Sequence, residues 1–253
     1  MTTLGILQAR VTSSRLPGKV LEPILGVPMI GRQIERLTRA SSLDGLVVAT
    51  SVDASDDELV SYLGTIGVSV VRGPLDDVLG RFVAVLDSYS PSVVVRLTGD
   101  CPLASPGLLD RVVGEFRARD LDYVSNTMVP TYPDGVDVEV VRADALRWVA
   151  EHSDDPHERE HATLGVYRRP ELFTVGNVSG DEDLSSLRWT VDNADDLAFV
   201  REVYSRLYAA NPEFELADVL GLVRAEPALS RTTMDAARNT ALDGLDTGAM
   251  KHG

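Results

Sequence analysis

The strongest constraint on the fold is an alternation of short apolar runs and amphipathic segments along the first 120 residues. The apolar runs predict buried strands, and the segments between them have the spacing of helices that bury one face. The predicted strands are 4–8, 46–50, 68–71 and 93–97, and the predicted helices are 28–40, 56–63, 77–88 and 106–119. This order predicts an α/β fold, a Rossmann-like three-layer αβα architecture with a mostly parallel sheet.

The pattern changes after residue 123. Strands are predicted at 136–141 and 187–191, and helices at 144–152, 195–209 and about 214–223. We interpret residues of about 125–190 as a mixed α/β insert in a single domain that spans residues 1–230. Residues 231–253 are polar and rich in small side chains, which predicts a flexible C-terminal tail.

The formal net charge of −15 argues against a nucleic-acid-binding protein, which would normally carry a basic face. A local cluster of cations can still bind a small anion. The one cysteine, Cys101, excludes an intrachain disulfide and fits a cytoplasmic location. The first residues lack the features of a signal peptide, and no apolar stretch is long enough to predict a membrane span.

A polar loop over residues 9–19 follows the first predicted strand and contains one of the two lysines of the chain, Lys19. The other is Lys251, so the remaining 22 of the 24 basic residues are arginines. Because ligands bind at the carboxyl ends of parallel strands, Arg10, Arg15 and Lys19 are well placed to bind a triphosphate. The alternative is a solvated surface loop with scattered arginines.

Two carboxylates follow predicted strands directly. Asp100 comes just after the strand at 93–97, where Mg²⁺ could be held beside phosphates, or where the side chain could cap the helix that begins near Pro106. Asp192 follows the strand at 187–191 and becomes a second metal ligand if the two strand ends lie together. Alone, it would be interpreted as the N-cap of the next helix. Cys101 is interpreted as a small packed side chain.

The insert is dense in carboxylates, arginine, histidine and asparagine at 126, 133–139 and 158–161. Such side chains can recognise a polyhydroxylated or anionic acceptor. His161 could serve as a base near neutral pH, although a lone histidine is more often structural.

Seven multi-residue motifs, in this order, carry a resemblance to a known family; they lie at 8–21, 71–79, 95–103, 122–127, 133–139, 158–161 and 187–192. The chain resembles the cytidylyltransferase family that includes the spore coat polysaccharide biosynthesis protein F group. This group is related to acylneuraminate and 3-deoxy-manno-octulosonate cytidylyltransferases. The resemblance extends from about residue 4 to residue 208.

The resemblance implies a core similar to GT-A glycosyltransferases and nucleotidyltransferases, CTP as donor, Mg²⁺ as cofactor, and a homodimer in which the insert helps to complete the neighbouring site. It implies catalytic roles for Arg10, Lys19 and Asp100, with Asp100 and Asp192 as metal ligands. The predicted nucleotide-binding residues are Gln8, Ala9, Arg10, Ser13, Arg15, Lys19, Arg72, Arg96, Thr98, Gly99 and Asp100. The predicted acceptor-binding residues are Asn126, Asp134, Glu139, Arg159, Glu160, His161 and Arg188.

The resulting prediction is an enzyme that transfers CMP from CTP to a sugar acid or another small anionic acceptor and releases pyrophosphate, in cell-surface polysaccharide or glycoconjugate biosynthesis. One alternative is a glycosyltransferase that uses a nucleotide sugar on the same fold. The cation-rich loop favours a triphosphate over a diphosphate sugar. The other alternative is a non-catalytic nucleotide-binding protein, against which the presence of Arg10, Lys19, Asp100 and Asp192 argues.

Overall fold

A seven-stranded sheet in the order β5-β4-β1-β6-β8-β7-β9 forms the centre of the protein, as seen in a computed structural model that describes residues 1–13 and 15–232. The strands are β1 (Thr3–Gln8), β4 (Gly45–Ser51), β5 (Ser69–Gly73), β6 (Val93–Thr98), β7 (Tyr123–Ser125), β8 (Glu139–Arg142) and β9 (Val175–Asn177). The four strands β5, β4, β1 and β6 are parallel, and a separate hairpin joins β2 (Pro23–Ile24) to β3 (Val27–Pro28). The predicted mostly parallel sheet is confirmed.

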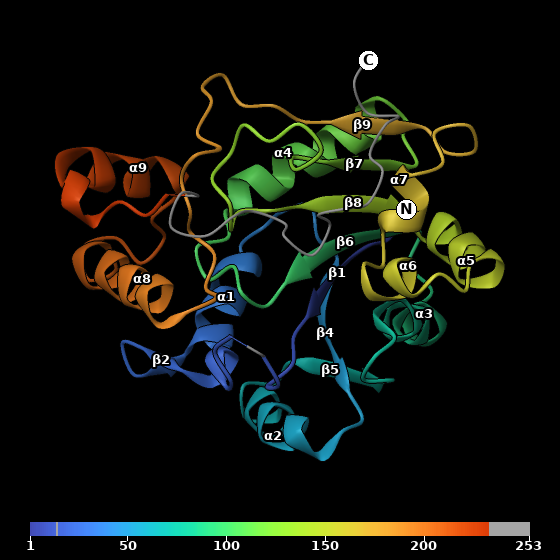
Figure 1. The fold of residues 1–253 in the computed structure, drawn as a ribbon, viewed down its shortest axis with the longest axis horizontal. Coiled ribbons are helices and arrows are strands. Elements are labelled where there is room, and N and C mark those ends of the chain that lie inside the picture. The colour runs from blue at the N-terminus through green and yellow to red at the C-terminus, as the bar shows by residue number, and fades with distance from the viewer. Residues whose placement is uncertain (14, 233–253) are drawn as a thin grey trace.

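Helices cover both faces of the sheet, which confirms the three-layer prediction (Figure 1). The α-helices are α1 (Met29–Leu37), α2 (Asp57–Thr65), α3 (Val78–Tyr89), α4 (Pro106–Ala118), α5 (Ala143–His152), α6 (Pro156–Glu160), α7 (Leu164–Tyr167), α8 (Ala194–Leu207) and α9 (Leu216–Ala225). Short 3₁₀ turns lie at Lys19–Leu21, Ala54–Asp56 and Pro227–Leu229. Helices α1, α4, α8 and α9 pack on one face, and α3 and α5 on the other.

The central strands are apolar without interruption because both of their faces are covered. Leu7 and Val95 point into the core beneath α1 and α4, whereas Ile6 and Val94 point into the core beneath α3 and α5. In the described part of the chain, no helix is long and apolar enough to cross a bilayer.

Strand β8 runs against its neighbours. It pairs antiparallel with β6 on one side and with β7 on the other, while β7 and β9 are parallel. Its first residue, Glu139, therefore lies opposite Arg96, near the carboxyl end of β6. This reversal brings the insert to the edge of the sheet where β1 and β6 end.

Three predictions about the elements were wrong. The segment 187–191 forms no strand, because it meets its neighbours only in isolated bridges, one between Asp134 and Arg188 and one between Leu187 and Thr232. Strand β8 begins at Glu139 rather than at 136, since the Asn126 side chain takes the hydrogen bonds of residues 136 and 138. Strands β7 and β9, three residues each, were missed.

The first residue of the predicted tail, Arg231, has a backbone hydrogen bond to the rest of the protein. The carbonyl of Arg231 accepts a hydrogen bond from the backbone N–H of Arg188 at 3.0 Å, so residue 231 belongs to the folded part of the protein. The rest of the predicted tail, residues 233–253, lies outside the described residues.

Gly135 sits where the insert passes residues 189–190, and it has a φ of 107°. A Cβ atom at this position would lie 2.3 Å from the Thr190 nitrogen and 2.5 Å from the Trp189 carbonyl carbon. We expect Gly135→Ala to lower the free energy of unfolding by about 3 kcal/mol, because backbone strain and overpacking add. Urea unfolding followed by circular dichroism measures the change.

Gly64→Ala is the matched control, because Gly64 is exposed in α2 and a Cβ atom there meets nothing within 4 Å. This control should stabilise the protein by about 0.5 kcal/mol. Equal urea midpoints for Gly135→Ala and the unsubstituted protein would contradict the role of Gly135.

Candidate active site

A cleft of about 530 Å³ opens where β1 and β6 end. It is lined by these predicted site residues: Gln8, Ala9, Arg10, Ser13, Arg15, Lys19, Arg96, Thr98, Gly99, Asp100, Glu160, His161 and Asp192. Gly99 is required here because the two strand ends approach closely, and a Cβ atom at this position would lie 2.9 Å from the Ala9 Cβ. The cleft therefore gathers most of the predicted nucleotide-binding residues and both predicted metal ligands.

The loop after β1 is anchored by Asp56, a residue that we interpreted from the sequence only as a helix start. Its buried carboxylate accepts hydrogen bonds from the Val11 N–H at 2.7 Å, the Thr50 hydroxyl at 2.9 Å and the Ser51 N–H at 3.0 Å. Burial disfavours the charged form, but these hydrogen bonds outweigh it and lower the pKa of Asp56. The ionised side chain thus fixes the base of the loop.

Arg81 of α3 is a second residue that sequence reasoning missed. Its side chain lines the cleft, is only 3% exposed, and donates at 2.7 Å to the carbonyls of Pro74 and Leu75. Burial and the nearby Arg10 guanidinium lower its pKa. The available signal was position, because Arg81 stands among Val78, Leu79 and Phe82 on the buried face of α3.

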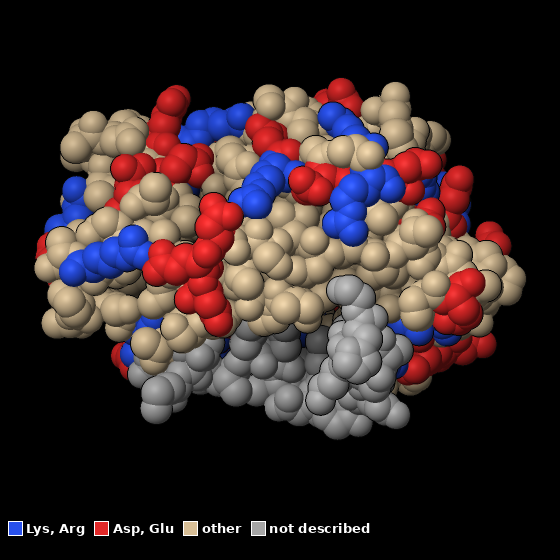
Figure 2. All heavy atoms as spheres, turned by 90° about the horizontal axis from the view of Figure 1, so that it is seen from above, with Lys and Arg blue, Asp and Glu red and all other residues tan. Residues whose placement is uncertain are grey.

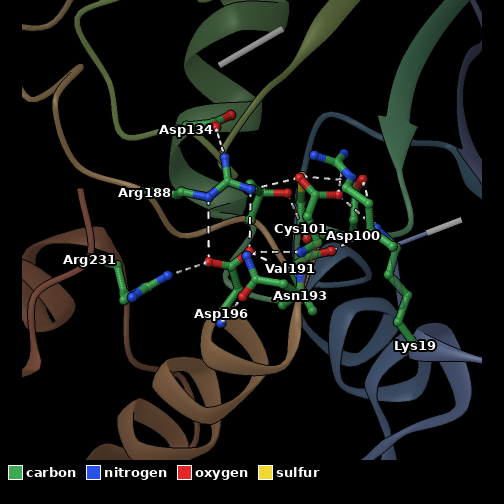
Figure 3. Close-up of polar contacts among 12 residues, drawn as sticks. Lys19, Asp100, Cys101, Asp134, Arg188, Val191, Asn193, Asp196 and Arg231 are labelled. Carbon is green, nitrogen blue, oxygen red and sulfur yellow. Dashed lines mark hydrogen bonds and ion pairs between the residues drawn. The ribbon is translucent and has the colours of Figure 1, made fainter. Parts of the chain in front are cut away.

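The ammonium of Lys19 lies between the two predicted metal ligands (Figure 3). Its Nζ is 3.1 Å from Asp192 Oδ1 and 3.4 Å from Asp100 Oδ2, and it donates to the Val191 carbonyl at 2.6 Å. Arg15 also reaches Asp192 Oδ1, at 2.8 Å. Lys19 therefore holds the two carboxylates on one wall of the cleft.

The backbone explains how two carboxylates 92 positions apart meet. The Asp100 carbonyl accepts hydrogen bonds from the Val191 N–H at 2.8 Å and from the Thr190 hydroxyl at 3.2 Å. The two capping alternatives fail, because Ser105 caps α4 and Asn193 caps α8. Both aspartates are left to face the cleft.

Burial opposes the charge of Asp100, but Lys19 and hydrogen bonds from Thr98 and Cys101 outweigh it, so the pKa of Asp100 lies below its ordinary value.

The surroundings of Cys101 shift its pKa in the opposite direction. Burial and the adjacent Asp100 carboxylate raise the pKa of this thiol well above its ordinary value. Cys101 is a buried thiol, as the sequence predicts, and is not activated as a nucleophile.

The donor set of Asp100 and Asp192 fits a magnesium ion. Mg²⁺ is bound in proteins by one or two carboxylates and completes its shell with phosphate and water. A cationic group, the Lys19 ammonium, already lies between these two carboxylates. No cluster of three or more His, Cys, Asp or Glu with metal-binding geometry occurs in residues 1–13 and 15–232, so no site built wholly from protein ligands competes there.

Two predicted acceptor residues, Glu160 and His161, line the cleft, and three others have structural partners instead. The Asn126 side chain bonds the backbone of residues 136 and 138. Glu139 accepts from Arg96, Thr163 and the Tyr123 hydroxyl, and Arg159 pairs with Asp77.

The remaining two acceptor candidates form a buried ion pair with each other. Arg188 Nη1 lies 2.9 Å from Asp134 Oδ2, and the Arg188 side chain is 1% exposed. The predicted nucleotide residue Arg72 also lies outside the cleft lining, where it bonds the carbonyls of Ser51 and Asp53 and pairs with Asp57 at 2.8 Å.

His161 is expected to be neutral at pH 7. Burial and the Arg96 guanidinium lower its pKa from the ordinary value of 6.5. As pH falls below 6.5, the unfolded chain takes up a proton that the folded protein does not, so the free energy of unfolding should fall with pH. His161→Asn should remove this part of the slope in urea unfolding between about pH 5.5 and 7.5, a range of about one unit on either side of an ordinary histidine pKa. An NMR titration of the imidazole with a midpoint at or above 6.5 would contradict the expectation.

Comparison with known proteins agrees with this geometry. A family model for cytidylyltransferases matches residues 4–210. The spore coat polysaccharide biosynthesis protein SpsF of Bacillus subtilis (strain 168) is 32% identical over 231 residues, which is 88% of this chain and 95% of SpsF.

Two solved structures share the fold. A cytidylyltransferase from Leptospira borgpetersenii serovar Hardjo-bovis superposes with a TM-score of 0.86 at 29% identity, covering 90% of this chain and 96% of that one. A CMP:2-keto-3-deoxy-manno-octonic acid synthetase in complex with CTP gives a TM-score of 0.64 at 19% identity, covering 81% and 99%. The family match extends from the second residue of β1 to beyond the end of α8 and includes both carboxylates and Lys19. The chain belongs to the cytidylyltransferase family.

Proposed function

We propose that the protein transfers CMP from CTP to a hydroxyl of a sugar acid, or of another small anionic acceptor, and releases pyrophosphate. The observation that carries this proposal is the arrangement of Lys19 between Asp100 and Asp192 on one wall of the cleft. Membership of the cytidylyltransferase family supports CTP as the donor.

The cations of the cleft would bind the triphosphate and stabilise the charge that develops on pyrophosphate. Arg10 is exposed near the start of the loop after β1, and Ser13 and Arg15 line the same cleft. These side chains position the α-phosphorus for in-line attack by the acceptor hydroxyl, so positioning and charge neutralisation supply the catalysis. No covalent intermediate with the protein is needed.

Asp100 and Asp192 are the proposed holders of Mg²⁺. When bound, the ion supplies charge neutralisation at the phosphates and lowers the pKa of the acceptor hydroxyl. The lowered pKa of Asp100 keeps this carboxylate ionised at neutral pH, as a metal ligand requires.

The acceptor would lie on the opposite side of the cleft, against Glu160 and His161. The names of two relatives support a sugar acid and a role in polysaccharide biosynthesis, since one is a spore coat polysaccharide biosynthesis protein and one a CMP:2-keto-3-deoxy-manno-octonic acid synthetase. We propose cell-surface polysaccharide or glycoconjugate biosynthesis as the process served.

We also propose a cytoplasmic homodimer. The single cysteine in the chain supports the location. Val129 and Leu172 are 56% and 53% exposed and lie in the insert, which supports the insert as the surface that meets the second copy. Light scattering after size exclusion tests the dimer, and a single species of monomer mass would contradict it.

Two experiments test the activity. A thermal-shift screen of the four nucleoside triphosphates with Mg²⁺ should show the largest stabilisation with CTP, because a bound ligand stabilises the folded protein by RT ln(1 + [L]/Kd). Pyrophosphate release should then require CTP, Mg²⁺ and a sugar acid from a panel of acceptors. Stabilisation by a UDP-sugar alone would favour a glycosyltransferase, and CTP binding without turnover across the panel would favour a non-catalytic protein.

A further inference from the structure

Asp192 also belongs to a buried group of charges whose other members, Arg188, Asp134 and Asp196, do not line the cleft (Figure 3). Arg188 is its centre. Nη2 lies 2.7 Å from Asp192 Oδ2, Nη1 lies 2.9 Å from Asp134 Oδ2, and Nη2 is also 3.3 Å from Asp196 Oδ2. One guanidinium thus contacts three carboxylates while its side chain is only 1% exposed.

The two oxygens of Asp192 have different partners. Oδ2 is taken by Arg188, whereas Oδ1 faces the cleft and contacts Lys19 at 3.1 Å and Arg15 at 2.8 Å. A carboxylate held by one oxygen cannot rotate freely about its terminal bond. Arg188 therefore determines which oxygen of Asp192 is presented to a ligand in the cleft.

Arg188 and Asp196 are also contacted by Arg231, which lies beyond the family match that ends at residue 210. The Arg231 carbonyl accepts from the Arg188 N–H at 3.0 Å, and Arg231 Nη2 lies 3.4 Å from Asp196 Oδ1. Asp196 in turn accepts from the N–H groups of Asp192 and Asn193 at 3.0 and 3.2 Å. Arg231 thus reaches Asp192 through Asp196 and through the backbone of Arg188.

We propose that Arg188 is a positioning residue that fixes the cleft-facing oxygen of Asp192, and that Arg231 braces Arg188 from outside the family-matched region. The inference rests on the proposed function, because it takes Asp192 as a metal ligand. It reassigns Arg188 from the acceptor-binding role predicted from sequence. Arginine suits this role better than lysine, because its planar fork donates to several carboxylates at once.

The test measures metal binding by the full-length protein. Arg188→Lys keeps the charge and loses the fork, and we expect it to weaken Mn²⁺ binding about tenfold, as removal of an outer-shell partner typically does. Electron paramagnetic resonance of free Mn²⁺, with a non-hydrolysable CTP analogue present, gives the dissociation constant. CTP binding without metal should change less than about twofold, since Arg188 does not line the cleft.

If Arg188 had only a structural role, Arg188→Lys would weaken CTP binding as well as Mn²⁺ binding. In Arg188→Lys, saturating Mn²⁺ should restore most of kcat, because Asp100, Asp192 and Lys19 are all retained. Arg224→Lys is the matched control, since Arg224 pairs with Glu182 at 2.6 Å at an exposed position on α9 and should leave Mn²⁺ binding unchanged. A folded Arg188→Lys protein with the Mn²⁺ affinity of the unsubstituted protein would overturn the positioning role.

Arg231→Gln tests whether Arg231 holds Arg188 in place. It also tests the positioning of Asp192 if Arg188→Lys does not fold. Its effect should be smaller, about threefold on the Mn²⁺ dissociation constant, because Arg231 acts through Asp196 and the Arg188 backbone. An unchanged constant would overturn the brace and, without a folded Arg188→Lys protein, the inference as a whole. If the unsubstituted enzyme binds Mn²⁺ but releases no pyrophosphate from CTP, the proposed function fails while this comparison of dissociation constants still stands.

Discussion

Lys19→Ala should lower kcat for pyrophosphate release by roughly a hundredfold or more, which is the cost of removing one preorganised electrostatic group. The substitution has two effects. It removes a cation from the cleft in which the triphosphate is proposed to bind. It also leaves Asp100 and Asp192 without the ammonium that lies 3.4 and 3.1 Å from them. Steady-state kinetics with CTP, Mg²⁺ and the best acceptor of the panel measure the loss.

Arg147→Ala is a suitable control for the loss of one cation, because Arg147 forms an exposed pair with Asp87 on α3, with 37% of its own side chain accessible. It should retain the kcat of the unsubstituted protein. Lys19→Arg is a second comparison, which keeps the positive charge but changes its shape. The planar guanidinium of arginine cannot occupy the position of the compact lysine ammonium. Near-normal kcat in Lys19→Ala would show that the residue is not part of the catalytic machinery.

Asp100→Asn should reduce kcat by about a thousandfold, because loss of a bound metal removes several kcal/mol of charge stabilisation. The amide keeps the shape of the side chain but not its charge. Because the loss acts through the metal, the Mn²⁺ dissociation constant should rise in the same variant. The same kinetic assay and the titration of free Mn²⁺ therefore measure two linked effects.

The control for Asp100→Asn is Asp183→Asn, since the Asp183 side chain is exposed and accepts hydrogen bonds from Ser185 within a surface turn. It should change neither quantity. Removal of the metal by EDTA should abolish the activity of the unsubstituted protein and leave little further loss in Asp100→Asn. If Asp100→Asn keeps both its turnover and its metal affinity, Asp100 is not a metal ligand.

The sequence predicts two kinds of element well: strands that are buried on both faces, and helices that bury one face. Strands β1, β4 and β6 are continuous apolar runs, and α1 and α4 carry helical spacing, so local pattern and tertiary burial agree. Strands β7 and β9 have three residues each, too few for an alternation to be recognised. The 187–191 segment looks like a strand because it is buried, yet its hydrogen bonds go to Asp134, Asp100 and Arg231.

The site residues divide in the same way. Arg10, Lys19 and Asp100 follow strands directly, so the topology of a parallel sheet brings them together. Glu139 and Arg188 were predicted to bind the acceptor; they are 8% and 1% exposed, and their charged groups contact protein partners. Sequence pattern does not reveal which charges are buried in pairs, because that depends on contacts between distant segments.

The surface agrees with the low pI of about 4.6. On the face shown in Figure 2, arginines are interspersed with aspartates and glutamates rather than gathered into a patch. The described surface also carries exposed ion pairs, such as Arg206 with Glu226 and Arg224 with Glu182. Pairs of this kind add little stability.

The reversed direction of β8 divides the cleft between two stretches of chain. Residues 8–10, 12, 13, 15, 19, 96 and 98–100 line the side assigned to the nucleotide, whereas Glu160 and His161 of the insert line the side assigned to the acceptor. Strand β8 pairs with β6 and not with β1, so Glu160 and His161 reach the cleft from a stretch of chain separate from the loop that follows β1. Substrate choice can therefore diverge among descendants of one ancestral enzyme while the chemistry of nucleotidyl transfer is inherited unchanged.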